Sequence, residues 1–339
     1  MISVKPSRVA IVGGTGAVGR TLLELIETRG FEYSSMRAIA SERTAGSYIR
    51  ALGQDILVED LATADFDNVD IAFFSAGTPV SAASAQRAAR SGALVIDNTN
   101  AFRMDPEAHL VVPQVNGSLL ARRPASGIIA NPNCSTIPLV RLLSPVQEAY
   151  GLRCAYVSTY QAASGGGQQG IDELHEGARR ILDGGQARAV RFSQPLAFDV
   201  LPAIDTLQAD GFTLEEHKMR QESRRILALP GLDLVATCVR VPVANGHSET
   251  VVLECERPMD AAELSALLDA QEEVKVWREG WPTPRTIVAE PDLVHVGRVR
   301  IDPERPTRAL LWLVSDNLRI GAALNAIQIA ERAVKEGIA

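Results

Sequence analysis

Residues 8–30, RVAIVGGTGAVGRTLLELIETRG, limit the possible folds of this chain more than any other segment. A short β-rich apolar run leads directly into closely spaced glycines, and an amphipathic helical pattern follows without a break. A strand that turns through glycines into a helix is the starting unit of a parallel sheet flanked by helices. We therefore expect an α/β fold from the beginning of the chain.

Further short apolar runs continue this pattern, and helical segments such as residues 81–92, SAASAQRAARSG, separate them. Continuous apolar runs are typical of parallel strands that are buried on both faces. We predict such strands at IAFFSAG (71–77), ALVIDNT (93–99), HLVVPQV (109–115) and GIIANPN (127–133). Residues 1–133 are thus predicted to form a doubly wound α/β domain.

The apolar runs after residue 134 are longer and alternate more clearly with polar residues, which favours a mixed or antiparallel sheet. Strands are predicted at 153–164, 234–243, 247–256, 293–302 and 308–317, and helices at 167–182 and 213–229. Residues 134–317 are therefore predicted to form an α+β domain. Residues 318–339 contain an amphipathic helix that is expected to pack back on the first domain. Two domains also suit a length of 339 residues.

Composition narrows the classes of function. A net charge of −7 without any Lys/Arg-rich stretch argues against a nucleic-acid surface and favours work on small molecules. No apolar stretch is long enough to cross a membrane and no leader pattern opens the sequence, so we expect a cytoplasmic protein. The four cysteines and five histidines lack disulfide or metal-site spacing, so no metal is expected.

The glycines of the first strand–helix turn indicate a dinucleotide site. Gly14, Gly16 and Gly19 stand in the GxGxxG register, in which the backbone approaches a pyrophosphate and a helix N-terminus offers N–H groups to it. A glycine-rich turn that binds no ligand is the alternative.

The end of the second predicted strand, AIASERTAG, bears on the choice of cofactor. Ser41, Arg43 and Thr44 suit the 2′-phosphate of NADP, since a guanidinium matches a phosphate in charge and geometry. Glu42 is the competing candidate, because NAD-binding folds use an acidic residue for the ribose hydroxyl. We expect NADP; the alternative leaves these residues as a solvated loop.

Cys134 stands between the apolar run GIIA and the helical pattern STIPLVRLLSPVQEAY. A thiol just before a helix N-terminus has a lowered pKa and lies near N–H donors for an oxyanion. Most lone cysteines are inert core residues, so position alone leaves a nucleophile and a buried thiol both open. Cys154 and Cys238, inside β-rich runs, are expected to be core residues.

His247, in RVPVANGHSETVV, is predicted to lie in a loop between two strands, where functional residues collect. Arg240 ends the first of these strands and is expected on the same hairpin. The pair could bring a carboxylate-binding guanidinium and an imidazole acid/base to one pocket, as a thioester mechanism at Cys134 requires. A solvated loop histidine is the alternative.

Seven motifs occur in the order found in aspartate-semialdehyde dehydrogenases: GGTGAVG, ASERTAG, NPNCST, YQAASGGG, EEHKM, RVPVANGHSE and SDNLRIGAALNA. The chain therefore resembles this family over nearly its whole length, and its shorter form most closely. The resemblance implies a Rossmann-type NADP-binding domain at 1–133, completed by the C-terminal helix 318–339. It also implies a catalytic and dimerisation domain of the glyceraldehyde-3-phosphate-dehydrogenase-like type at 134–317, and a homodimer.

The resemblance implies NADPH-dependent reductive dephosphorylation of L-aspartyl-4-phosphate to L-aspartate 4-semialdehyde and phosphate. This reaction belongs to the biosynthesis of lysine, threonine, methionine and isoleucine. Cys134 would form a thioester, His247 would be the acid/base at the hemithioacetal oxygen, and Gln161 would orient the acyl group. The implied substrate contacts are Arg240 for the α-carboxylate, Glu216 for the ammonium group, and Lys218 and Arg103 for the phosphate.

The cofactor contacts implied by the resemblance lie in the glycine turn and at three later positions: Gly14, Thr15, Gly16, Ala17, Val18, Ser164, Gly165 and Asn317. The chain departs from the family pattern at Gln114, Asp199 and Ile320. None of these departures removes a catalytic group. Asp199 and Ile320 could alter subunit contacts or a surface near the cofactor.

Three other functions remain open from the sequence. An N-acetylglutamyl-phosphate reductase would share the thiol and the glycine turn, but its acylated amine would not need Glu216. A non-catalytic nucleotide-binding paralogue is disfavoured by the presence of Cys134, Gln161, Arg240 and His247. A Rossmann isomerase or epimerase would form no thioester, and near-normal turnover of Cys134→Ser would support it.

Overall fold

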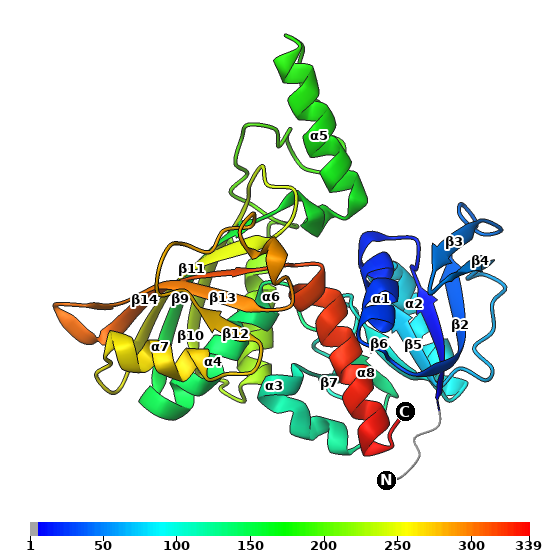
Figure 1. Ribbon diagram of the computed structural model, residues 1–339, viewed down its shortest axis with the longest axis horizontal. Helices are drawn as coiled ribbons and strands as arrows, with labels where there is room; N and C mark the ends of the chain where they lie inside the picture. The colour runs from blue at the N-terminus through cyan, green and yellow to red at the C-terminus, as the bar shows by residue number, and fades with distance from the viewer. Residues whose placement is uncertain (1–5) are drawn as a thin grey trace. The chain divides into compact units, whose positions relative to one another are not determined.

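The computed structural model describes residues 6–339, and the chain divides into two compact units (Figure 1). Unit 1 comprises residues 1–133 and 322–339, and unit 2 comprises residues 134–321. Residues 1–5, where the sequence predicts no leader, lie outside the described part of the chain.

Unit 1 is built on one eight-stranded sheet with the strand order β3-β4-β2-β1-β5-β6-β8-β7. All neighbouring strands are parallel except β3 and β4. The central strands are almost completely buried, as their continuous apolar sequences predict. The predicted doubly wound parallel sheet is confirmed. Its strands are β1 (Ser7–Val12), β2 (Tyr33–Ala40), β3 (Tyr48–Ala51), β4 (Gln54–Asp60), β5 (Ile71–Phe74), β6 (Leu94–Asp97), β7 (His109–Leu110) and β8 (Ile128–Ala130).

The helices of unit 1 include its C-terminal segment, because α8 packs against α1 and β6. The strand predicted at 109–115 is shorter than expected: only β7 forms. It ends at Leu110, and Pro113 begins α3, since proline lacks the N–H that a strand donates but fits the first turn of a helix. The helical elements are α1 (Ala17–Thr28), α2 (Thr78–Arg90), α3 (Pro113–Asn116), η1 (Gly117–Ala121) and α8 (Leu324–Glu336).

The glycine turn joins β1 to α1 so closely that side chains are excluded. Gly13 has a φ of +93°, and an added Cβ would lie 2.9 Å from the backbone of Ser75 and Ala76. A Cβ at Gly19 would lie only 2.3 Å from the Gly13 carbonyl oxygen. The first turn of α1 therefore packs directly on the loop, and its N–H groups face the space above the strand end.

Unit 2 contains a six-stranded mixed sheet with the order β10-β9-β11-β14-β13-β12. β9 runs parallel to β10 and antiparallel to β11, and β14 is antiparallel to both β11 and β13. The alternating sequence patterns predict such a sheet, and this prediction is confirmed. The strands are β9 (Leu152–Gln161), β10 (Asp233–Arg240), β11 (His247–Cys255), β12 (Val274–Val276), β13 (Val294–Asp302) and β14 (Arg305–Ser315).

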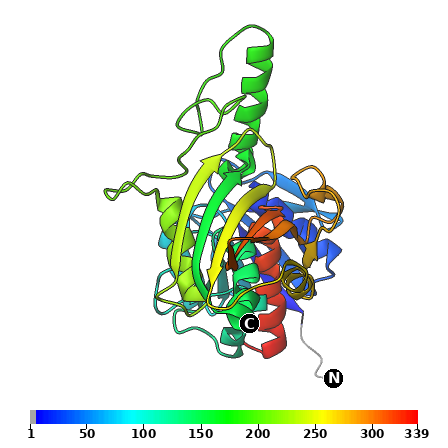
Figure 2. The ribbon, with the colours of Figure 1, turned by 90° about the vertical axis from the view of Figure 1, so that its left-hand side faces the viewer.

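One face of this sheet packs against α4, α6 and α7. Along β9 the buried side chains alternate with more exposed ones such as Tyr156 and Tyr160, which lie on the other face. Figure 2 shows this second face turned toward the viewer, without a helix of unit 2 over it. The helical elements are α4 (Thr136–Tyr150), η2 (Ala163–Gly166), α5 (Gln168–Leu182), α6 (Leu214–Ile226), α7 (Ala261–Asp269), η3 (Ile287–Ala289) and the π-helical turn η4 (Arg319–Ala323).

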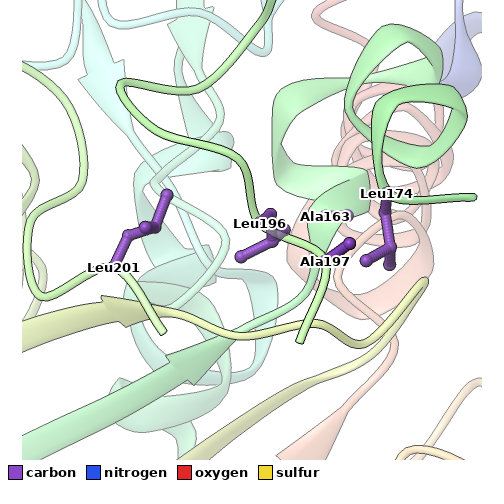
Figure 3. Close-up of a cluster of buried hydrophobic side chains, with 5 residues drawn as sticks. All are labelled: Ala163, Leu174, Leu196, Ala197 and Leu201. Atoms are coloured by element: carbon purple, nitrogen blue, oxygen red, sulfur yellow. The ribbon is translucent and has the colours of Figure 1, made fainter. Parts of the chain in front are cut away.

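A small apolar cluster secures the irregular segment that follows α5. Its buried members are Ala163, Leu174, Leu196, Ala197 and Leu201, and Figure 3 shows their side chains near η2 and α5. Phe192 packs against this cluster. Residues 192–201 are thereby held beside η2, the element that directly follows β9.

Candidate active site

Cys134 lies two residues before α4, at the beginning of unit 2. β8 ends at Ala130, and Ser135 is the residue that precedes the first turn of α4. The thiol is half-buried and forms no disulfide, while Cys238 and Cys255 are buried. Burial raises the pKa of the Cys255 thiol to about 11 and raises the pKa of Cys238 further, so both remain protonated at neutral pH. Cys134 therefore has the position expected of a reactive thiol.

His247 is the first residue of β11, as the strand predicted at 247–256 has it, so the prediction that it lies in a loop is wrong. Its side chain is completely buried. Nδ1 accepts a hydrogen bond from the backbone N–H of Ala162 over 3.0 Å, and Nε2 has no partner within residues 6–339. Burial lowers the pKa of His247 well below its usual value, and the charge of Arg240 lowers it further. The ring is thus neutral.

Arg240 ends β10, but β10 and β11 do not form a hairpin, because β9 pairs between them. The expectation of a shared hairpin is wrong. Arg240 instead stands opposite Gln161, the last residue of β9, in parallel register. Since β11 is antiparallel to β9, it begins at the same edge, and His247 follows there. Three neighbouring strands thus bring Arg240, Gln161 and His247 together.

The guanidinium of Arg240 is buried among several partners. Nη1 donates to the carbonyl oxygen of Ala162 over 2.6 Å, and the Phe192 ring lies 5.5 Å from the guanidinium carbon. A Cβ at Gly165 would lie 2.5 Å from Nη1, so a side chain at this position would displace the guanidinium. Burial lowers the pKa of Arg240, while Glu215 and the Cys134 sulfur act in the opposite direction. Cys134 is therefore electrostatically coupled to this edge of the sheet.

Gln161 connects this edge to α6. Its Nε2 donates to Thr159 Oγ1 over 3.3 Å and to Glu215 Oε1 over 3.2 Å. Lys218 Nζ donates to Glu215 Oε2 over 3.3 Å and to Asp205 over 2.6 Å. The two carboxylate oxygens of Glu215 thus accept hydrogen bonds from two predicted site residues, Gln161 and Lys218. Glu215 itself was not predicted from the sequence.

Glu216, the predicted ammonium partner, points elsewhere. Its carboxylate accepts a hydrogen bond from the backbone N–H of Thr213 over 2.8 Å, which completes a capping box at the start of α6. The other oxygen accepts from the backbone N–H of Cys238 over 3.0 Å. The T-L-E-E sequence carries this capping signal, and the three-residue spacing from Lys218 is the signal that would have found Glu215.

The side chains of Ser164 and Asn317 form hydrogen bonds within unit 2. The Ser164 hydroxyl lies 2.9 Å from the side-chain oxygens of Asn245 and Asn317, and Asn317 Oδ1 accepts from the N–H of Gly246 over 3.0 Å. Both side chains are buried. These bonds join η2, the loop before β11 and the segment after β14, while the Asn317 amide nitrogen takes no part in them.

The remaining predicted residues belong to unit 1. Thr15, Ala17 and Val18 lie in the turn before α1 and in its first residues. Ser41, Arg43 and Thr44 follow β2 in a turn closed by bonds from the Thr44 and Ala45 N–H groups to the Ser41 carbonyl. Ser41, Glu42 and Arg43 are exposed. Their side chains are therefore accessible to a ligand.

Arg103 is buried in unit 1 beside the carboxyl ends of β6 and β8. Its Nε donates to the carbonyl oxygen of Asn131 over 2.9 Å, and Nη2 donates to that of Asn98 over 3.1 Å. The guanidinium is thus oriented by the backbone that leads toward Cys134.

Comparison with known proteins shows the family to which this chain belongs. Two family models match, "Semialdehyde dehydrogenase, NAD binding domain" over residues 8–122 and "Semialdehyde dehydrogenase, dimerisation domain" over residues 143–320. The aspartate-semialdehyde dehydrogenase of Bacillus subtilis (strain 168) is 43% identical over 335 residues, which cover 95% of this chain and 96% of that protein. This chain belongs to the aspartate-semialdehyde dehydrogenase family.

A second relative and a solved structure of the aspartate-semialdehyde dehydrogenase family match the chain over a similar length. Aspartate-semialdehyde dehydrogenase 2 of Vibrio cholerae is 43% identical over 329 residues, covering 97% of this chain and 98% of that protein. The crystal structure of aspartate semialdehyde dehydrogenase II from Vibrio cholerae, complexed with ASA, has a TM-score of 0.95 and 42% identity, covering 98% and 99% of the two chains. The family, fold class and oxidoreductase class predicted from the sequence are confirmed.

One departure from the family pattern of aspartate-semialdehyde dehydrogenases needs correction. Ile320 is completely buried, so it does not alter a surface as expected, whereas Asp199 is exposed. Within residues 6–339, no helix is long and apolar enough to cross a membrane. The predicted cytoplasmic location stays a prediction.

Proposed function

We propose that this chain catalyses the NADPH-dependent reductive dephosphorylation of L-aspartyl-4-phosphate through a thioester at Cys134. The products would be L-aspartate 4-semialdehyde and phosphate, and the aldehyde would serve the biosynthesis of lysine, threonine, methionine and isoleucine. The observation that carries the proposal is the convergence of Arg240, Gln161 and His247 at one sheet edge, electrostatically coupled to the thiol.

The glycine turn of unit 1 fits a nicotinamide dinucleotide. A Cβ at Gly13 or Gly19 would clash with neighbouring backbone, so these glycines keep the turn between β1 and α1 tight, and the N-terminus of α1 supplies N–H groups for a pyrophosphate. The exposed Arg43, with Ser41 and Thr44, supports a contact with the 2′-phosphate of NADP. We assign further contacts to Ser164, Gly165 and Asn317, through backbone atoms at the first two positions.

Cys134 would act as the nucleophile. Its thiolate attacks the acyl carbon, the bond from that carbon to the phosphate oxygen breaks, and the acyl group stays on sulfur as a thioester. The N-terminus of α4 supports the thiolate and the developing oxyanion with its N–H groups. NADPH, when bound, supplies the hydride that reduces the thioester.

His247 would act at the hemithioacetal oxygen. Because Nδ1 accepts from Ala162, the proton of the neutral ring is on Nε2, which can donate to that oxygen. When the carbon–sulfur bond breaks, this proton returns from the hemithioacetal oxygen to Nε2, the aldehyde leaves and Cys134 returns to the thiolate. Gln161 would orient the acyl group from the end of β9.

The charged groups suit an amino-acid acyl phosphate. Arg240 would bind the α-carboxylate, and Lys218 and Arg103 would bind the phosphate. For the ammonium group we now propose Glu215 in place of Glu216, because Glu215 bonds to Gln161 and Lys218. An ammonium subsite favours aspartyl phosphate over an N-acylated substrate.

We also propose a homodimer. The matched dimerisation domain covers residues 143–320, and the sheet face that carries Tyr156 and Tyr160 would form the interface.

The test is reduction of NADP with aspartate semialdehyde, with and without phosphate. We expect phosphate-dependent turnover with NADP, and much weaker turnover with NAD or with the N-acetylglutamate analogue. Absence of turnover with aspartate semialdehyde would refute the proposal, and preference for the N-acetylated aldehyde would support the alternative reductase.

A further inference from the structure

Gly321 lies directly against Cys134. A Cβ built on Gly321 would lie 2.8 Å from the Cβ of Cys134, 2.9 Å from its carbonyl oxygen and 3.1 Å from its Cα. Real Cβ atoms essentially never approach other heavy atoms within 3.0 Å, so one partner must shift if a side chain is added. Gly321 therefore presents a bare Cα on which the backbone of Cys134 rests.

The π-helical turn η4 sets the position of Gly321. The Gly321 N–H donates to the carbonyl oxygen of Asp316 over 3.2 Å, which is the five-residue spacing of a π-helix. The Asp316 carboxylate accepts from the N–H groups of Leu318 and Arg319 over 2.9 and 3.1 Å. The Arg319 guanidinium pairs with both oxygens of Asp292 over 2.6 and 3.0 Å. The turn is thus fixed at its start and at its side.

The same segment is attached to the backbone around His247. Ser315, the last residue of β14, stands opposite His247 in the β11–β14 register. Two residues later, Asn317 accepts a hydrogen bond from the N–H of Gly246, which directly precedes His247. Residues 315–321 therefore connect the backbone beside His247 with the backbone contact to Cys134.

We propose that Gly321 is a positioning residue for Cys134, and that residues 315–321 fix the nucleophile relative to His247. This inference rests on the proposed role of Cys134 in thioester formation. A methyl group on Gly321 would displace Cys134 by a few tenths of an ångström. Since a misplacement of about 1 Å in a reacting geometry costs about 100-fold in rate, we expect a loss of about tenfold.

The test compares Gly321→Ala with Gly231→Ala. A Cβ at Gly231 would meet nothing within 4 Å, so this matched control adds the same methyl group in open space. We expect Gly321→Ala to lower kcat by about tenfold while KM changes by less than about twofold. Gly231→Ala should retain wild-type turnover.

A second readout follows the thiol itself. Alkylation by iodoacetamide, resolved by peptide mass spectrometry, should be several-fold slower at Cys134 in Gly321→Ala, because the displaced sulfur loses the support of the α4 N-terminus. Alkylation at the half-buried Cys154 serves as the internal reference and should not change. Unchanged kcat and unchanged Cys134 alkylation in a folded Gly321→Ala protein would overturn the proposal.

A double variant covers the case in which Gly321→Ala folds poorly. Cys134→Gly removes the Cβ at the closest contact, so the fall in Tm caused by Gly321→Ala should be smaller in the Cys134→Gly background. An equal fall in both backgrounds would overturn the contact with the Cβ of Cys134, the closest of the three. Both the alkylation and the Tm arms are independent of turnover. Turnover retained in Cys134→Ala would refute the thioester mechanism. It would not change the alkylation and Tm results, which test the contact between Gly321 and Cys134.

Discussion

The backbone N–H of Ala162 donates a hydrogen bond to Nδ1 of His247 over 3.0 Å. This contact assigns the proton of the neutral ring to Nε2, because a proton on Nδ1 would set two donors against each other. Burial and the charge of Arg240 lower the pKa of His247 in the same direction. The ring is therefore arranged as a neutral donor.

This arrangement predicts the pH dependence of turnover. Because the pKa of His247 is lowered, its neutral form persists through pH 6.5, the ordinary value, and is lost only as the pH falls well below it. We expect the kcat profile to show no His247 inflection at pH 6.5 or above. His247→Asn should lower kcat by about 100-fold, with KM changed by less than about twofold. An inflection near pH 7 that His247→Asn removes would contradict this account.

Glu215 and Glu216 should differ in their effects when each is changed to glutamine. Glu215 bonds to Gln161 and Lys218, so Glu215→Gln should raise the KM for aspartate semialdehyde by about tenfold or more through loss of the ammonium contact. Both oxygens of Glu216 accept from backbone N–H groups, of Thr213 and Cys238, and glutamine has only one oxygen to offer, so Glu216→Gln should lower the free energy of unfolding by about 1 kcal/mol with less effect on KM. Steady-state kinetics and urea unfolding of both variants provide the measurements. The reverse pattern would restore Glu216 as the substrate contact.

Arg43 is expected to select the cofactor. Its exposed side chain follows β2, where a 2′-phosphate would bind. Arg43→Glu should raise the KM for NADP by about 100-fold and leave that for NAD nearly unchanged, because only NADP loses a charge-assisted bond and gains repulsion. Arg50→Glu, on the nearby strand β3, is the matched charge control. An unchanged ratio of NADP to NAD use in Arg43→Glu would place the phosphate contact elsewhere.

Glu249 should make the fold less stable as the pH rises above 4.5. Its side chain is completely buried, both carboxylate oxygens lack a partner within the described residues, and burial raises its pKa well above 4.5. A raised pKa in the folded state gives stability that is fully present below pH 4.5 and is lost as the pH rises toward the folded pKa. Glu249→Gln should therefore lose less stability than the wild type between pH 5 and pH 8.

Urea unfolding midpoints at pH 5, 6.5 and 8 would measure this difference. Glu279→Gln, at an exposed position, is the control and should follow the wild type. Equal pH dependence of Glu249→Gln and the wild type would show that Glu249 does not titrate differently in the folded chain.

Local sequence patterns predict much of this fold because they depend on short-range periodicity. The glycine turn at Gly14–Gly19 and the helix that follows Cys134 both form where the sequence places them. The pairing of strands is a long-range property. Nothing local in the sequence around Arg240 and His247 reveals that β9 inserts between their strands, and the hairpin expectation failed for that reason.

The positions of the site residues also depend on contacts that local sequence patterns do not show. Adjacent positions on a helix point about 100° apart, so a resemblance that is displaced by one residue exchanges Glu215 for Glu216. The capping box of Thr213 and Glu216 was present in the sequence and distinguishes the two roles. The contact of Gly321 with Cys134 joins residues from opposite ends of unit 2 and has no local signature.

The central claim is the thioester at Cys134, and single-turnover kinetics without phosphate test it most directly. Aspartate semialdehyde and NADP should give a burst of about one NADPH per subunit, because the thioester forms but is not released. Mass spectrometry of the quenched enzyme should locate an acyl adduct on Cys134. A burst of equal size in Cys134→Ala, or an adduct confined to Cys154, would contradict the account.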